Sequence, residues 1–123
     1  MQGQVLEILQ NSLVKCKPAL GEESREVTDM RLSLLHLNII LRNPNWALVE
    51  DLVIVLSKSA KIYGDRSIVD RLGVIGKILL EKGRVLYAEA LFKAAIQLYM
   101  RLLDGASDEL LKTVDVKNNS LLN

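Results

Sequence analysis

The part of the sequence that most constrains the fold is residues 75–96, where two apolar faces of helical period meet at a glycine. Before the glycine, Ile75, Ile78 and Leu79 follow the three-and-four spacing of one helix face. After it, four apolar residues repeat that spacing: Ala88, Leu91, Phe92 and Ala95. Gly83 can adopt the left-handed conformation that ends a helix. The stretch therefore predicts two helices joined by a tight turn.

Small residues at Gly76 and Ala88 would let the backbones of these two helices approach closely. The residues of this stretch fit a known pattern: Leu72, Ile75, Gly76, Leu79, Gly83, Val85, Ala88, Phe92 and Ala95. In these positions the chain resembles a tetratricopeptide repeat, although Leu79 and Val85 stand where aromatic residues are usual. The resemblance implies helical hairpins that stack on one another and bind other proteins. The competing interpretation is an ordinary helical hairpin.

The remaining sequence is read as helices separated by short breaks. The expected helices cover residues 4–17, 23–42, 46–63, 68–82, 85–103 and 107–114. A short buried strand at 53–55 is the competing interpretation for the third segment, but its flanks keep helical spacing. Asp65 or Ser67 could supply the N-cap oxygen of the fourth helix. A break is expected at 104–107, before the short sixth helix.

The breaks recur at a regular distance along the chain. Gly21, Gly64 and Gly105 are 43 and 41 residues apart, and the inner turns at 45–46 and 84–85 are 39 apart. Such a period is typical of stacked helical hairpins. It is similar to the long tetratricopeptide repeats of kinesin light chain and nephrocystin.

We therefore expect an all-α, right-handed stack of antiparallel helical hairpins in one domain over residues 1–116. Its parts would be a half repeat at 4–20, repeats at 22–63 and 65–104, a capping or half repeat at 107–114 and a frayed tail at 117–123. The chain would be either a segment of a longer array or a small array sealed by its own ends. Half repeats cannot bury both faces, so an exposed apolar strip and self-association are expected.

Composition narrows the classes of partner. The 16 basic and 15 acidic residues give a net charge of +1, which offers no basic patch for nucleic acid. The longest apolar run, 52–56, is far below the roughly 20 residues needed to cross a bilayer. Cys16 is the only cysteine, so no internal disulfide can form, and a cytoplasmic location without membrane insertion is expected.

Reactive residues do not gather in the sequence. His36 is the only histidine and stands among leucines, whereas a metal site needs several converging ligands. Cys16 has no histidine nearby in the sequence to activate it. We therefore expect no catalytic residues, no metal, no cofactor and no enzymatic activity.

The resemblance places a concave binding groove along the first helices of successive repeats. On the helix at 68–82, the expected outward stripe is Asp70, Val74, Lys77 and Glu81. The residues 39 places earlier are Arg31, Leu35, Asn38 and Arg42. Arg42 and Lys77 would pair with acidic side chains of a bound peptide, and Asn38 would bond its backbone. The competing interpretation is a solvated helix face with scattered charges.

The function expected from this arrangement is protein–protein interaction, as an adaptor or scaffold that binds a peptide or helix. The alternative is a structural or assembly subunit that associates with other copies, or packs into a larger complex, through its exposed apolar end helices.

Overall fold

The computed structural model describes residues 2–21, 24–58 and 63–122, with side chains described for 4–21, 24–58 and 63–105. The five helices of the described residues are α1 (Gln2–Leu20), α2 (Arg25–Ile39), α3 (Trp46–Ser57), α4 (Arg66–Glu81) and α5 (Val85–Leu122). No strand occurs within these ranges, and residues 53–55 lie inside α3. The prediction of an all-α chain is therefore confirmed.

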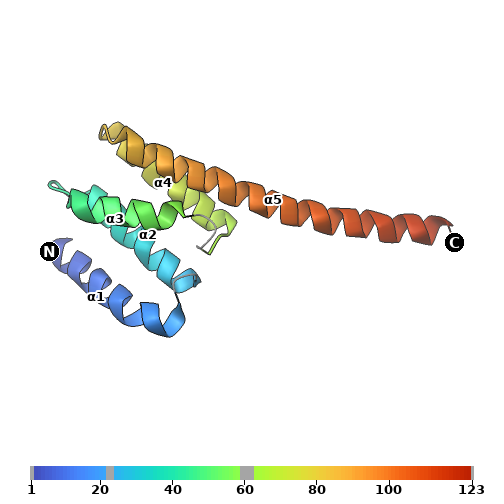
Figure 1. Ribbon diagram of the computed structural model, residues 1–123, viewed down its shortest axis with the longest axis horizontal. Coiled ribbons are helices and arrows are strands. Elements are labelled where there is room, and N and C mark those ends of the chain that lie inside the picture. The colour runs from blue at the N-terminus through green and yellow to red at the C-terminus, as the bar shows by residue number, and fades with distance from the viewer. Residues whose placement is uncertain (1, 22–23, 59–62, 123) are drawn as a thin grey trace.

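The helices pack around α2 and along α5 (Figure 1). α2 contacts α1, α3 and α4, and α4 packs along the first half of α5, which also contacts α3. The second half of α5 extends away from the other helices (Figure 1). The two inner turns meet as well, because the Arg84 guanidinium lies 3.9 Å from the ring centroid of Trp46.

Polar N-caps fix where three helices begin: Ser24 for α2, Asn45 for α3 and Asp65 for α4. In each, a side-chain oxygen accepts the backbone N–H three residues later, at 2.9–3.2 Å. Of the two candidates for α4, Asp65 is therefore the cap, and the Ser67 hydroxyl donates to it at 2.8 Å. The Ile68 N–H, and then the Ser67 hydroxyl, lower the pKa of the Asp65 carboxyl.

Glycines in the left-handed region end α1 and α4. Gly21 has φ of 88° and Gly83 has φ of 78°. After Gly83, the Arg84 N–H donates to the Leu79 carbonyl at 2.9 Å, which is the bond of a Schellman cap. The turn predicted at Gly83 is confirmed. Pro18 does not end α1, which continues to Leu20.

Several helix ends differ from the prediction. α2 stops at Ile39 rather than at 42, and α3 stops at Ser57 rather than at 63, although residues 59–62 of that segment lie outside the described residues. The predicted break at 104–107 and the separate helix at 107–114 are wrong, because α5 is one helix from Val85 to Leu122. Of the tail predicted to be frayed, residues 117–122 lie in this helix and residue 123 lies outside the described residues. A helical glycine such as Gly105 costs only about 1 kcal/mol relative to alanine, which does not by itself break a helix.

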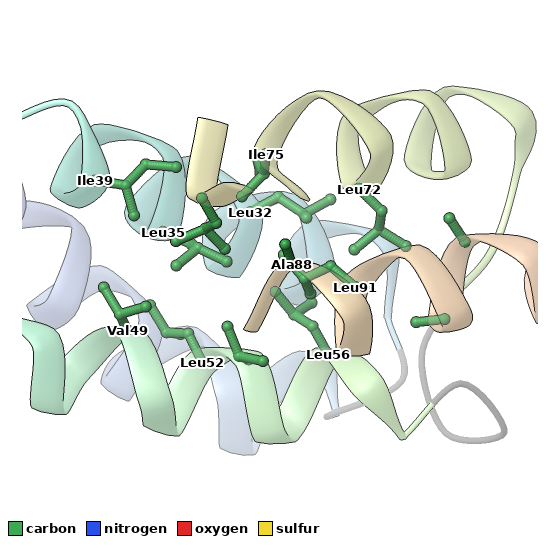
Figure 2. Close-up of a cluster of buried hydrophobic side chains, with 14 of the residues drawn as sticks. Leu32, Leu35, Ile39, Val49, Leu52, Leu56, Leu72, Ile75, Ala88 and Leu91 are labelled. Carbon is green, nitrogen blue, oxygen red and sulfur yellow. The ribbon is translucent and has the colours of Figure 1, made fainter. Parts of the chain in front are cut away.

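The core lies between α2, α3, α4 and the first half of α5. Figure 2 shows its side chains converging from all four helices: Leu32, Leu35, Ile39, Val49, Leu52, Leu56, Leu72, Ile75, Ala88 and Leu91. From the other side of α2, the α1 residues Leu6, Leu9 and Leu13 pack against this core. Gly76 is buried against Phe92, and a Cβ atom there would lie 2.8 Å from the Phe92 ring.

The buried positions recur along the chain. The buried residues of α4 are Ile68, Leu72, Ile75, Gly76 and Leu79. The residues 41 places earlier, on α2, are also all buried: Val27, Arg31, Leu34, Leu35 and Asn38. For α3 and α5 the matching offset is 39, since Val49, Leu52 and Leu56 correspond to the buried Ala88, Leu91 and Ala95. The two helix pairs α2–α3 and α4–α5 therefore bury equivalent faces.

Candidate binding groove between α2 and α4

The four α4 residues of the predicted stripe lie on the surface. Val74 is 52% exposed, and Asp70, Lys77 and Glu81 are exposed as well. They follow one another at helical spacing along the side of α4 away from the core. Their role in binding stays a prediction, but they are placed to take part in it.

Most of the stripe residues predicted on α2 are buried. Leu35 and Asn38 have no exposed surface and Arg31 is only 4% exposed, so the prediction that these three side chains face outward is wrong. Arg42 is exposed, but it lies in the α2–α3 linker rather than on α2.

Asn38 has a structural role instead of the predicted contact with a peptide. Its amide Nδ2 donates to the Asn45 carbonyl at 2.9 Å, and its Oδ1 accepts the Asn45 N–H at 3.0 Å. Asn45 in turn caps α3 through its side chain. Asn38 thus bonds the backbone of its own chain and fixes the turn between α2 and α3.

The error has a physical origin in the two turns. The α2–α3 linker, residues 40–45, is three residues longer than the α4–α5 linker, residues 82–84. Helix starts after the turn are 39 residues apart, whereas the N-caps Ser24 and Asp65 before it are 41 apart. Aligning the two hairpins at their turns therefore shifts α2 by two residues relative to α4. Two residues correspond to about 200° around a helix, so the wrong face of α2 was predicted to be exposed.

With the offset of 41, the equivalents of the α4 stripe are Asp29, Ser33, His36 and Ile40. All four are partly or largely exposed. Sequence reasoning missed them because the turns were aligned rather than the N-caps. The two caps were visible in the sequence and carried the correct offset.

Polar contacts hold α2 and α4 together along this surface. Arg71 Nη1 donates to Asp29 Oδ1 at 2.9 Å, and Nη2 donates to Ser33 Oγ at 3.0 Å and to the Asp29 carbonyl at 3.5 Å. Arg25 lies 3.8 Å from the same Asp29 carboxylate. The Arg71 guanidinium and the Asp29 carboxylate are partly exposed, so solvent weakens their attraction. The contacts of Arg71 nevertheless link α4 to α2 at this point of the surface.

Next to these contacts the surface is hollowed. One hollow of about 340 Å³ is lined by Ser33, His36, Leu37, Ile40 and Arg71. A smaller one between α1 and α2 is lined by Val5, Leu37, Ile40 and Leu41. Because Leu37 and Ile40 line both, the two hollows adjoin at the C-terminal end of α2. We name this surface, together with the α4 stripe, the α2–α4 groove.

The α2–α4 groove has an apolar floor and a charged rim. Leu37 and Ile40 supply the apolar area of the hollows, which form the floor. The rim is the exposed α4 stripe, where Asp70 and Lys77 carry opposite charges. Such a surface suits an apolar side chain flanked by polar groups, as in helix or peptide recognition. Among the described residues, no group of three or more His, Cys, Asp or Glu side chains could hold a metal ion.

A search of the described helices finds none whose length and hydropathy would allow it to cross a membrane. Comparison of the chain with models of protein families, with curated proteins and with solved structures gives no match.

Proposed function

We propose that this chain is a non-catalytic protein-interaction module that binds a peptide or helix in the α2–α4 groove. The proposal includes its architecture: a stack of two tetratricopeptide-like hairpins, α2–α3 and α4–α5, preceded by α1 as the second helix of a half repeat. Its adaptor or scaffold role would follow from presenting this groove to a partner.

The observation that carries the proposal is the recurrence of buried positions. Five buried residues of α4 have buried equivalents 41 residues earlier, and the N-caps Ser24 and Asp65 share that offset. α1 continues the pattern, since Leu6, Leu9 and Leu13 stand 43 residues before the buried Val49, Leu52 and Leu56. Repetition of one buried face is what a stack of like hairpins requires.

The groove's chemistry supports a peptide or helix as the ligand. An apolar anchor could enter the hollow lined by Leu37 and Ile40, and polar groups of the ligand could meet Lys77 and Asp70 on the rim. Buried apolar anchors supply most of the affinity of such contacts, while rim charges mainly steer and orient the partner.

The experiment begins with peptides selected against the folded chain by display and measured by titration calorimetry. Ile40→Glu places a charge in the hollow and is expected to weaken binding at least about tenfold, because a buried charge without a partner is costly. Ile54→Glu is the matched control: Ile54 is 48% exposed, compared with 49% for Ile40, but lies on α3 and lines neither hollow. Equal affinity for both variants would refute the groove assignment.

A further inference from the structure

The larger hollow of the α2–α4 groove has a polar lining as well as its apolar floor. Ser33, His36 and Arg71 line it with a hydroxyl, an imidazole and a guanidinium, next to Leu37 and Ile40. None of the described residues that line this hollow carries a carboxylate. The hollow therefore presents hydrogen-bond donors and one permanent positive charge, which favour a negatively charged ligand group.

The Arg71 guanidinium is held in position and is still open to a ligand. Its hydrogen bonds to Asp29 and Ser33 engage three of the five N–H groups that an arginine carries, so two are not used within the described residues. The Arg71 side chain is 34% exposed. Because its position is already fixed, the guanidinium would lose little side-chain entropy on binding a carboxylate.

Asp29 does not cancel the positive charge beside the hollow. Its carboxylate lies 2.9 Å from Arg71 Nη1 and 3.8 Å from Arg25 Nε, so two guanidinium groups share one carboxylate. The cluster of these three side chains therefore keeps one net positive charge. A single further carboxylate would neutralise this charge, whereas a phosphate dianion would leave the cluster with an excess of negative charge.

We propose that the larger hollow binds a carboxylate of the peptide, from an aspartate or glutamate that stands next to an apolar residue. This inference rests on the function proposed above and adds the chemistry of the ligand. The carboxylate accepts hydrogen bonds from Arg71 and His36, while the apolar neighbour packs on Leu37 and Ile40. Hydrogen bonds between charged groups are roughly twice as strong as neutral ones, so the carboxylate selects the ligand as well as orienting it.

A random peptide library displayed on phage tests the class of ligand. Peptides that bind the wild type but bind Ile40→Ser more weakly depend on the groove, since this variant removes apolar surface without adding charge. Among these peptides, Asp or Glu beside an apolar residue should be enriched relative to the unselected library. Selection on Arg71→Gln should keep the apolar residue and lose this enrichment.

The selection separates this inference from the proposed function. Groove-dependent peptides without acidic enrichment would overturn the carboxylate site and leave the proposed function standing. If no selected peptide depends on Ile40, both are refuted.

Titration calorimetry with one selected peptide measures the pairing with Arg71. Changing the acidic residue of the peptide to its amide should weaken binding to the wild type about tenfold or more and leave binding to Arg71→Gln nearly unchanged. Each ratio is measured within one variant, so a loss of stability in Arg71→Gln cancels, and circular dichroism checks that the variant is folded.

Lys77→Gln is the matched control, because it removes an equal charge from the exposed stripe of α4 without altering the lining of the hollow. It should retain the tenfold ratio. A ratio that survives Arg71→Gln, or that Lys77→Gln abolishes, would overturn the assignment to Arg71. Tighter binding of a peptide with phosphoserine at the acidic position would overturn the choice of a carboxylate.

Discussion

Replacing Gly76 with alanine tests the close packing of α4 against Phe92 of α5. An ideal Cβ at Gly76 would lie 2.8 Å from Phe92 Cε1 and 3.1 Å from Cδ1 and Cζ, so the ring must move. Gly73, one turn earlier on α4, has nothing within 4 Å of its ideal Cβ. Both glycines are inside the same helix. Comparing Gly73→Ala with Gly76→Ala therefore separates the effect of helix propensity on stability from the effect of packing.

The magnitude follows from these two terms. Alanine in place of a glycine inside a helix stabilises by about 0.5–1 kcal/mol, and this gain is common to Gly73→Ala and Gly76→Ala. Overpacking against Phe92 costs about 1–3 kcal/mol and applies to Gly76→Ala alone. We therefore expect Gly76→Ala to be less stable than Gly73→Ala by about 1–3 kcal/mol, with Gly73→Ala more stable than the wild type.

Urea unfolding followed by circular dichroism measures both free energies of unfolding, at one protein concentration so that any dimerisation contributes equally. A double-mutant cycle with Phe92→Leu identifies the cause, because a smaller side chain at 92 should remove much of the penalty of Gly76→Ala. Equal stability of the two alanine variants, or a difference that Phe92→Leu leaves unchanged, would show that Phe92 does not limit the space at Gly76.

Three further substitutions test other contacts by the same unfolding assay. Asn38→Ala should destabilise by about 1–3 kcal/mol, because the Asn45 backbone loses both bonds to a buried amide; a loss below 0.5 kcal/mol would contradict the role assigned to Asn38. Asp65→Asn keeps the N-cap but cannot titrate. Since the folded-state pKa of Asp65 lies below its ordinary value of 3.8, its ionisation stabilises the wild type above that pH and this is lost as pH falls through the lowered pKa. The wild type should therefore lose stability relative to Asp65→Asn below about pH 4, and parallel pH profiles would refute this. Arg71→Ala should cost about 1 kcal/mol, less at 1 M salt, because its pair with Asp29 is partly exposed; a salt-independent loss would assign the effect to packing.

Local sequence signals predicted most of the helices. Gly83, with a positive φ, stands between two apolar faces, and polar caps precede α2, α3 and α4. These features act within a few residues of the chain, so spacing and residue type alone reveal them. The close contact of Gly76 with the second helix was predicted for the same reason, and the structure identifies Phe92 as the side chain that fills the space.

Two kinds of signal failed, each for a physical reason. Asp104, Gly105 and Ser107 have the composition of a break, but their combined propensity cost is small and α5 continues through them. The α2 face was misassigned because its register depends on linker length, which local spacing does not reveal. Asn38 shows the consequence, since a polar residue that was predicted to bind a ligand bonds a backbone segment seven residues away.

The most direct test of the account is the footprint of a display-selected peptide on the isotopically labelled chain, measured by nuclear magnetic resonance. If the peptide binds in the α2–α4 groove, the largest chemical-shift changes are expected at Ser33, His36, Ile40, Val74 and Lys77. Little change is expected along α5. Changes concentrated on α3 or α5, with the groove residues unaffected, would contradict the groove assignment.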